Sequence, residues 1–307
     1  MAYSPARIRQ RVYVNHLATG QLAYIPMSVP VSIEKALLDA TTRLRDVSES
    51  PRLDAELLLA RSIDMPRSYL FAHPEDTLDN AAIGRLDQTL ERRINGEPMA
   101  YITGIKEFWS LELFVSPGTL VPRPETELLV DIALREIPRK ADWTVLDLGT
   151  GSGAIALAIA KERQLCQLTA TDVSADALAV ARENARQLLV SNIEFLQGNW
   201  TEPVAGQKFR VIASNPPYVA ADDDVLESLR AEPTVALAAG EDGLDSIAIL
   251  ARDCPSIIED DGLLVLEHGA EQRDQVAAVL LSYGWDHIQC YDDYSGLPRV
   301  TSATYSR

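Results

Sequence analysis

The residues best suited to chemistry lie in the run Ser214-Asn215-Pro216-Pro217-Tyr218, which follows the predicted strand Arg210–Ala213. Two consecutive prolines hold a backbone extended and keep its carbonyls out of a β-ladder. The Asn215 side-chain oxygen and the Pro216 carbonyl therefore offer two acceptors to one NH2 group, and Tyr218 offers an aromatic face to a planar amide or base. Such a grip would aim a poorly nucleophilic planar nitrogen at a methyl donor. The alternative interpretation is a proline turn with a capping asparagine.

A second candidate site is the glycine-rich run Asp147-Leu148-Gly149-Thr150-Gly151-Ser152-Gly153, with Asp172 following 19 residues after its last glycine. Glycines allow a sharp turn and close approach of a ligand, and an acid after the next strand can accept hydrogen bonds from ribose hydroxyls. A dinucleotide site favours G-x-G-x-x-G and a pyrophosphate, whereas the acid Asp147 discourages a phosphate. A nucleoside that carries a sulfonium cation fits this loop better. A tight turn without a ligand is the remaining alternative.

These motifs must be positioned by an alternation of strands and helices that begins near Trp143. Such alternation predicts an α/β fold with a largely parallel sheet and helices on both faces. The carboxyl ends of its strands would then hold both motifs. The predicted strands are Thr144–Leu148, Gln167–Thr171, Ile193–Leu196, Arg210–Ser214 and Leu263–Leu266, and the predicted helices are Ala154–Arg163, Ala175–Leu188 and Leu244–Leu250.

The residues before this alternation predict three further parts. Residues 32–98 show apolar residues at one-turn spacing and form a helical domain, in which Pro51 follows the N-cap Ser50 and a third helix runs from about Leu78 to Asn95-Gly96. Residues 99–121 read as a β-hairpin linker, and residues 122–307 as the catalytic domain, which opens with a helix at Pro124. Residues 1–31 form an extension that we expect to be disordered. Its three arginines and lack of acids also fit a transit peptide.

Composition narrows the classes of partner. The chain has 307 residues and a net charge of −17, which disfavours a phosphate backbone and suits a basic partner. Its three cysteines, Cys166, Cys254 and Cys290, show no metal spacing with the histidines, so we expect no metal and buried thiols in a reducing cytoplasm. No apolar run approaches the roughly 20 residues that span a bilayer.

The motifs together resemble the class I, Rossmann-like methyltransferases that use S-adenosyl-methionine, and the Asn-Pro-Pro-Tyr form resembles those that act on planar nitrogens. Upstream residues resemble the HemK/PrmC family, protein glutamine methyltransferases of peptide chain release factors. These residues are Gly96-Glu97-Pro98, Tyr101-Ile102-Thr103-Gly104, Glu107-Phe108-Trp109 and Leu120-Val121-Pro122-Arg123-Pro124-Glu125-Thr126-Glu127. The resemblance runs from about Ser32 to the C-terminus.

The resemblance implies a role for each matching residue. Gly149, Thr150, Gly151, Ser152 and Gly153 would cradle the methionine part of S-adenosyl-methionine, and Asp172 would bind its ribose. Asn199 and Trp200 would flank the adenine, although the family usually has Asp at position 199. Asn215, also counted among the cofactor-binding residues, would act with Pro216 and Tyr218 in catalysis. Asn215, Pro216, Pro217 and Tyr218 would hold the substrate glutamine. The segment with Arg123 and Glu125 would shape the pocket roof.

The resemblance implies that the chain transfers a methyl group to the glutamine of the Gly-Gly-Gln motif of class 1 release factors. The helical domain would then recognise the substrate, and the enzyme would be a cytoplasmic monomer without a DNA or membrane partner. Two alternatives stay open: an adenine-N6 DNA methyltransferase and a non-enzymatic adaptor that binds S-adenosyl-methionine.

Overall fold

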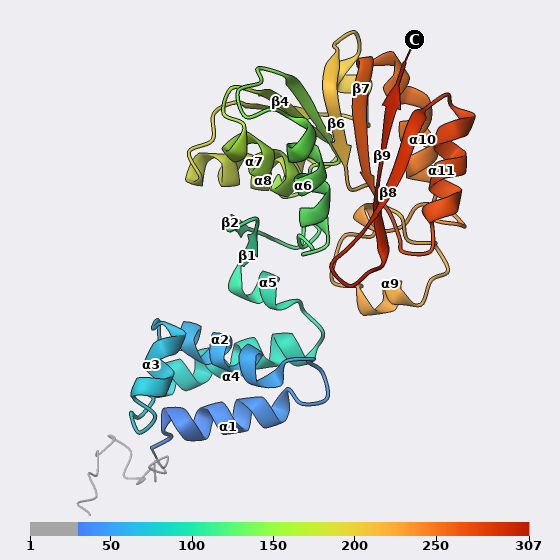
Figure 1. Ribbon diagram of the computed structural model, residues 1–307. Helices are drawn as coiled ribbons and strands as arrows, with labels where there is room; N and C mark the ends of the chain where they lie inside the picture. The colour runs from blue at the N-terminus through green and yellow to red at the C-terminus, as the bar shows by residue number, and fades with distance from the viewer. Residues whose placement is uncertain (1–29, 307) are drawn as a thin grey trace, which may run out of the picture.

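The computed structural model describes residues 30–306, and Figure 1 shows a group of helices beside a larger α/β part. The expectation of disorder for residues 1–31 falls, apart from Pro30 and Val31, outside the described residues. The predicted division at residues 98 and 121 stays a prediction, although secondary structure changes character near both positions.

The N-terminal part consists of α1 (Ile33–Arg43), α2 (Pro51–Ser62), α3 (Arg67–Ala72) and α4 (Asn80–Ile94). Ser32 caps α1 by accepting from the Lys35 N–H, and Asp79 caps α4 by accepting from the Ala82 N–H. The apolar faces meet in one buried core that includes Ile33, Leu37, Leu58, Leu59, Leu86 and Leu90. The short helix α3 is not predicted from the sequence.

A short helix and a hairpin connect the two parts of the molecule. α5 (Met99–Thr103) is followed by β1 (Ile105–Phe108) and β2 (Leu111–Phe114), which pair antiparallel. The turn residues Trp109 and Ser110 both have positive φ, which suits the twist of a two-residue hairpin. Phe108 and Leu113 are buried in the core of the α/β part, so this hairpin is packed against that part of the molecule.

A seven-stranded sheet forms the centre of the α/β part, in the order β5-β4-β3-β6-β7-β9-β8. The first five strands of this order are parallel, as predicted, and β9 runs antiparallel to both its neighbours. The strands are β3 (Thr144–Leu148), β4 (Gln167–Asp172), β5 (Ile193–Gln197), β6 (Phe209–Ser214), β7 (Ile258–Glu267), β8 (Asp286–Asp292) and β9 (Pro298–Tyr305).

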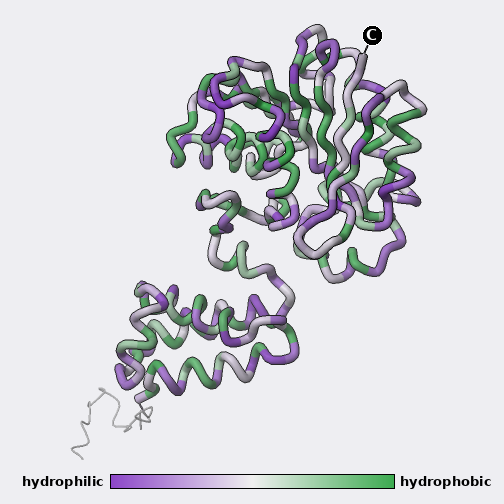
Figure 2. The backbone as a smooth tube through the Cα atoms, in the orientation of Figure 1, coloured by the Kyte–Doolittle hydropathy of each residue, from purple (hydrophilic) through white to green (hydrophobic). Residues whose placement is uncertain are grey.

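Helices cover both faces of this sheet because its central strands are apolar on both sides. Val145 and Val211 face one core with α6 (Thr126–Glu136) and α7 (Ala154–Glu162). Their neighbours Leu146 and Ile212 face the other core with α10 (Asp245–Asp253) and α11 (Arg273–Ser282). α8 (Ala175–Gln187) packs on β4 and β5. Figure 2 shows the hydrophobic residues concentrated along these strands and the inner faces of the helices.

The predicted helix start at Pro124 is wrong by two residues. The N–H groups of Thr126, Glu127 and Leu128 donate to carbonyls three residues back, so a tight turn over Arg123–Glu125 precedes the regular helix α6.

Among residues 30–306, no helix is long and apolar enough to cross a membrane, and no group of His, Cys, Asp or Glu side chains is placed to hold a metal ion. Cys166 and Cys254 are buried, as expected, whereas Cys290 is partly exposed.

Candidate functional site

Three loops meet at the carboxyl edge of the sheet because β4, β3 and β6 are neighbours in it. Leu148, the last residue of β3, pairs with Thr171 on one side and with Ser214 on the other. The glycine turn, Asp172 and Asn215 each follow one of these residues. The two predicted motifs therefore open at the same edge of the sheet.

The glycine turn leaves β3 and curls toward the end of β4. Gly149, Gly151 and Gly153 have φ values of 73°, 56° and 86°, a region that costs other residues strain. A Cβ on Gly149 would stand 3.4 Å from the Trp200 ring, which is ordinary contact, so the positive φ rather than the space favours glycine at this position. A Cβ on Gly153 would meet Leu157 and Ala181 at 3.0 Å and 3.2 Å, so this glycine lets α7 and α8 pack closely.

Asp172 is held in place by the backbone around it. Its Oδ2 accepts from the Gly151 N–H at 2.9 Å, and its Oδ1 accepts from the Ser174 N–H at 2.8 Å. Each carboxylate oxygen can accept more than one hydrogen bond, so both keep capacity for a ligand.

A cavity of about 500 Å³ joins these features to the Asn-Pro-Pro-Tyr corner. Segments from residues 117–120 and 233–238 close it from the other side. The predicted site residues that line it are Gly149, Gly151, Asp172, Asn199, Trp200, Asn215 and Pro217. Thr150, Ser152 and Gly153 do not line it; Thr150 and Ser152 are buried beneath the turn.

Asp147 lies under the glycine turn rather than in the cavity lining. Its Oδ2 accepts from the Thr150 hydroxyl at 2.6 Å and from the Ala156 N–H at 3.2 Å. Its Oδ1 is buried without a partner among the described residues. Burial raises the pKa of Asp147 to about 7 against these two hydrogen bonds, which lower it. The side chain thus ties the turn to the start of α7.

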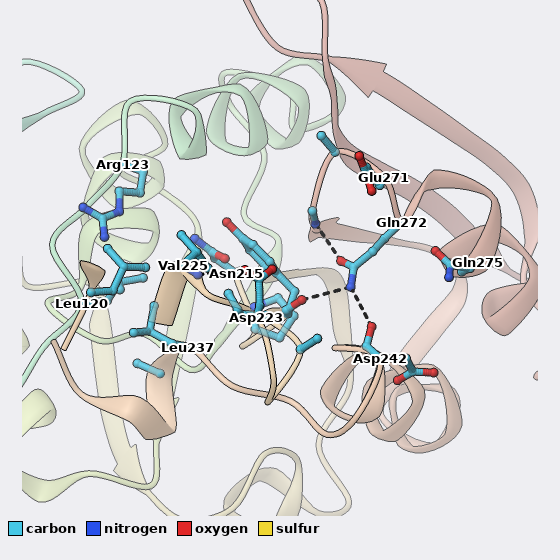
Figure 3. Close-up of a pocket in the computed structure, with 18 residues that line it drawn as sticks. Leu120, Arg123, Asn215, Asp223, Val225, Leu237, Asp242, Glu271, Gln272 and Gln275 are labelled. Atoms are coloured by element: carbon cyan, nitrogen blue, oxygen red, sulfur yellow. Dashed lines mark hydrogen bonds between the residues drawn. The ribbon is translucent and has the colours of Figure 1, made fainter. Parts of the chain in front are cut away.

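A second cavity of about 560 Å³ lies on the other side of Asn215 and is drawn in Figure 3. Pro216 and Tyr218 line it, and Asn215, Leu120 and Ala236 line both cavities. Gln272 fixes one wall, since its Nε2 donates to the carbonyls of Tyr218 at 3.0 Å and Asp242 at 3.2 Å, and its Oε1 accepts from the Gly269 N–H. Asn215 therefore stands where the two cavities adjoin.

Two partly buried hydrogen bonds hold the Asn-Pro-Pro-Tyr corner. The Asn215 Nδ2 donates to the Thr126 hydroxyl at 3.2 Å, and the Tyr218 hydroxyl donates to Glu267 Oε1 at 3.1 Å. Glu267 is completely buried at the end of β7, and its Oε2 has no partner within the described chain. Burial raises the pKa of Glu267 to about 7, while the nearby hydroxyl groups of Thr126 and Tyr218 lower it. Burial also raises the pKa of Tyr218.

An ion pair joins the two segments that separate the cavities. Arg123 Nη2 lies 2.5 Å from Glu232 Oε1, and the Glu232 Oε2 accepts from the Val121 N–H at 3.0 Å. The Glu232 side chain is buried. Arg123 also lines the second cavity, whereas Glu125 lines neither cavity, and the role of their segment as the pocket roof stays a prediction.

Sequence reasoning gave no individual role to four residues that this geometry brings to the site: Thr126, Glu232, Glu267 and Gln272. Only Glu267 carries a sequence signal, because an acid directly after the apolar strand residues Leu263–Leu266 stands at the ligand-binding edge of a parallel sheet. The other three are recognised only through long-range contacts.

Comparisons with known proteins agree with this architecture. Two family models match the chain: the PrmC N-terminal domain over residues 35–104 and the methyltransferase small domain over residues 125–241. A solved methyltransferase from Pyrococcus furiosus has a TM-score of 0.52 at 19% identity, covering 72% of this chain and 100% of that chain. This likeness shows the fold and confirms the predicted α/β class.

Curated relatives match nearly the whole chain. The release factor glutamine methyltransferase of Vibrio cholerae serotype O1 is 46% identical over 279 residues, which are 90% of this chain and 97% of the relative. The protein of the same name from Escherichia coli (strain K12) is 42% identical over 271 residues, which are 88% and 97% of the two chains.

Proposed function

The chain belongs to the family of release factor glutamine methyltransferases, and from this premise we propose how its residues divide the work of the reaction. It is an enzyme that transfers a methyl group to a glutamine side chain of peptide chain release factors. The first cavity binds S-adenosyl-methionine, and the second receives the glutamine, which belongs to the Gly-Gly-Gln motif of class 1 release factors.

The residues of the first cavity fit this cofactor. Gly149 and Gly151 leave room for a ligand at the turn, Asp172 has free acceptor capacity for ribose hydroxyls, and Trp200 offers a ring to the adenine. Asn199 offers an amide oxygen to the adenine amine. When bound, the cofactor supplies an electrophilic methyl group on a sulfonium.

The single observation that carries the division is that Asn215 lines both cavities. Its Nδ2 is taken up by Thr126, so its Oδ1 is the group left to accept from a substrate NH2. The Pro216 carbonyl is the second acceptor, and Tyr218 packs on the planar amide. Two fixed acceptors orient the amide nitrogen, and this orientation replaces a strong general base.

A transfer assay with labelled S-adenosyl-methionine tests whether the glutamine of the Gly-Gly-Gln motif is the substrate. The purified protein is incubated with a release factor and with a variant of it in which the glutamine of the Gly-Gly-Gln motif is replaced by alanine. Labelling of the first alone is expected, and equal labelling of both would contradict the proposal. Incubation of the protein with labelled cofactor and purified DNA tests the alternative that the chain is an adenine-N6 DNA methyltransferase. Binding of the cofactor without transfer to any release factor would favour the alternative that the chain is a non-enzymatic adaptor.

Asn215→Ala tests the residue assignment. Loss of an acceptor that acts in the transition state should lower kcat about 100- to 1000-fold. The affinity for S-adenosyl-methionine, measured by calorimetry, should change little. A variant that transfers methyl groups at the wild-type rate would remove Asn215 from the catalytic machinery.

The proposal also covers the state of association of the enzyme, its compartment and the absence of a DNA partner. The enzyme works as a monomer in the cytoplasm, and its net charge of −17 supports the absence of a DNA partner. Sedimentation of the free protein and of its mixture with a release factor measures both states of association.

A further inference from the structure

The side chain of Gln272 connects three loops that form one wall of the second cavity (Figure 3). Its own loop lies between β7 and α11, and its Oε1 accepts there from the Gly269 N–H at 2.8 Å. Its Nε2 donates to the Tyr218 carbonyl at 3.0 Å, in the loop after β6, and to the Asp242 carbonyl at 3.2 Å, in the loop before α10. Segments that are far apart along the chain therefore meet at one amide.

The chemistry of these three partners fixes the direction of the Gln272 amide. A carbonyl oxygen can only accept a hydrogen bond, and a main-chain N–H can only donate one. The amide must therefore turn its NH2 group toward Tyr218 and Asp242, and its oxygen toward Gly269. Both hydrogens of the NH2 group are engaged by the protein, so Gln272 holds the wall of the cavity and does not donate to a substrate.

Two glycines leave the space that this amide occupies. A Cβ on Gly243 would lie 2.2 Å from the Tyr218 carbonyl oxygen and 2.7 Å from Gln272 Nε2. A Cβ on Gly269 would lie 3.0 Å from Gln272 Oε1. Gly243 also has a φ of 73°, in the region that favours glycine. A side chain at position 243 would thus displace the contact between Gln272 and Tyr218.

The hydrogen bond to Tyr218 holds one end of the Asn-Pro-Pro-Tyr corner. Ser214 holds the other end, because its hydroxyl donates to the Leu148 carbonyl at 2.7 Å. Pro216 and Pro217 lie between these two ends and have no N–H and a fixed φ, so a displacement of Tyr218 is transmitted through them. The position of the Pro216 carbonyl, the proposed second acceptor for the substrate NH2, therefore depends on a hydrogen bond two residues further along the chain.

We propose that Gln272 is a positioning residue that holds the main chain of Tyr218, and through the stiff proline pair the Pro216 carbonyl, in place for methyl transfer. This inference rests on the proposed function of the Asn-Pro-Pro-Tyr corner. Gln272 lines the second cavity and not the first, so its role concerns the placement of the substrate amide and not the binding of the cofactor.

Gln272→Met tests the proposal, because methionine fills a similar volume and cannot donate to a carbonyl. Its kcat should fall about 10- to 100-fold, since a misplaced acceptor loses contacts made in the transition state. The Kd for S-adenosyl-methionine, measured by calorimetry, should stay within about twofold of that of the wild type. A kcat within about threefold of the wild type, or a cofactor Kd that rises as much as kcat falls, would overturn the inference.

Gln272→Glu gives a readout that a loss of packing alone would not produce. When ionised, the new carboxylate accepts from Gly269 but faces two carbonyls to which it cannot donate; when protonated, it can donate to one of them. Its kcat relative to the wild type at the same pH should therefore rise about fivefold or more from pH 8 to pH 5.5. The ratio for Gln272→Met should stay within about twofold over this range, and an equally constant ratio for Gln272→Glu would contradict the proposal.

The charges around position 272 favour the protonated form of the introduced acid. Three acids line the same cavity, and they disfavour a further negative charge: Asp223, Asp242 and Glu271. Arg123, which also lines it, is paired with the buried Glu232. Arg273, the next residue in the chain, is exposed, so solvent and salt screen its charge. These groups and the two carbonyls should raise the pKa of the introduced carboxyl.

Controls separate this outcome from misfolding and from failure of the proposed function. Gln187→Met makes the same change at the exposed end of α8, where the side chain donates to Glu183, and it should leave kcat unchanged. Thermal melts report on the folding of every variant. Wild-type transfer to the release factor is measured first. If that transfer fails, the proposed function fails; if it succeeds and Gln272→Met matches it, only the positioning role is lost.

Discussion

At the scale of single residues, Asp172 combines a structural contribution with the binding role proposed for it. Its two oxygens accept the N–H groups of Gly151 and Ser174, so its carboxylate fixes the glycine turn and the start of α8 together. The same oxygens face the first cavity with spare lone pairs. A ligand that uses them meets a carboxylate whose orientation is already set, and little ordering is needed on binding.

Replacement of Asp172 by alanine should therefore weaken cofactor binding. Loss of hydrogen bonds to a charged acceptor costs about 1.5–3 kcal/mol, so the Kd for S-adenosyl-methionine should rise about 10- to 100-fold in calorimetric titrations. Asp176→Ala is the matched control, because this acid is exposed in the first turn of α8 and lines neither cavity. An unchanged Kd for Asp172→Ala would refute the ribose assignment.

Replacement of Asn199 by aspartate should strengthen cofactor binding, in contrast to the loss expected at Asp172. The resemblance to the family places an aspartate at this position, and Asn199 lines the first cavity. A carboxylate accepts more strongly from the adenine amine than an amide does, so Asn199→Asp should lower the Kd for S-adenosyl-methionine about two- to fivefold. The same titration measures it, and tighter binding by Asn199→Ala than by Asn199→Asp would contradict the adenine contact.

At the scale of elements, the two cavities are separated by segments that lie outside the α-helices and β-strands and include only the 3-10 turn Thr234–Ala236. Residues 117–121 and 229–238 provide Leu120 and Ala236, which line both cavities. Glu232 connects these segments through the Val121 N–H and the Arg123 guanidinium. Because Glu232 is buried, its replacement leaves polar groups without partners, which is costly.

Glu232→Ala should loosen both cavities at once. A broken buried pair and an unsatisfied N–H cost about 3 kcal/mol, so the cofactor Kd and the release factor KM should both rise, about tenfold or more. Limited proteolysis should cut residues 219–243 faster than in the wild type. Glu227→Ala is the control, because its ion pair with Arg230 is exposed and such pairs contribute about 0–1 kcal/mol. Equal Kd, KM and proteolysis rates for the two variants would show that the contacts of Glu232 do not support the cavities.

The elements that could be predicted from the sequence are those whose pattern is local. β3, β4 and β6 are short runs rich in aliphatic and β-branched residues, and the glycine turn and the proline pair identify the loops after β3 and β6. β8 and β9 escape prediction because they lie toward one edge of the sheet and carry mixed polar residues, so neither shows a clear period. The contacts of Asn215 with Thr126 and of Tyr218 with Glu267 join residues 89 and 49 positions apart, which no local pattern encodes.

At the scale of the whole molecule, the hairpin is more than a connection between the helical and the α/β parts. Phe108 and Leu113 are buried in the core of the α/β part. Asn184 on α8 binds the Phe114 N–H and carbonyl, and its Nδ2 also donates to the Ser152 carbonyl in the glycine turn. The hairpin and the glycine turn therefore share one buried side chain, which links the position of the upstream segment to the shape of the first cavity.

The buried carboxyl of Glu267 should also make the stability of the molecule depend on pH. Burial raises its pKa to about 7 in the folded protein, from an ordinary value of 4.5. A group whose pKa is raised by folding stabilises the fold fully below the unfolded pKa and loses this contribution as the pH rises through the folded pKa. The raised pKa of Asp147 changes the free energy of unfolding with pH in the same direction, whereas the lowered pKa of His268 changes it in the opposite one. The pH dependence of the wild type alone therefore does not isolate the contribution of Glu267.

Glu267→Gln isolates the contribution, because glutamine has a similar shape and no titration. The free energy of unfolding of this variant relative to wild type should rise by about 2 kcal/mol between pH 5 and pH 8, since the wild type must ionise a buried acid over this range and the variant need not. Denaturant unfolding at both pH values measures the difference. Glu183→Gln is the control: this acid is partly exposed and its pKa is lowered to about 2, so its contribution does not change above pH 5. A difference between Glu267→Gln and wild type that stays constant from pH 5 to pH 8 would show that Glu267 titrates as an ordinary acid and that the corner behind Asn215 is open to water.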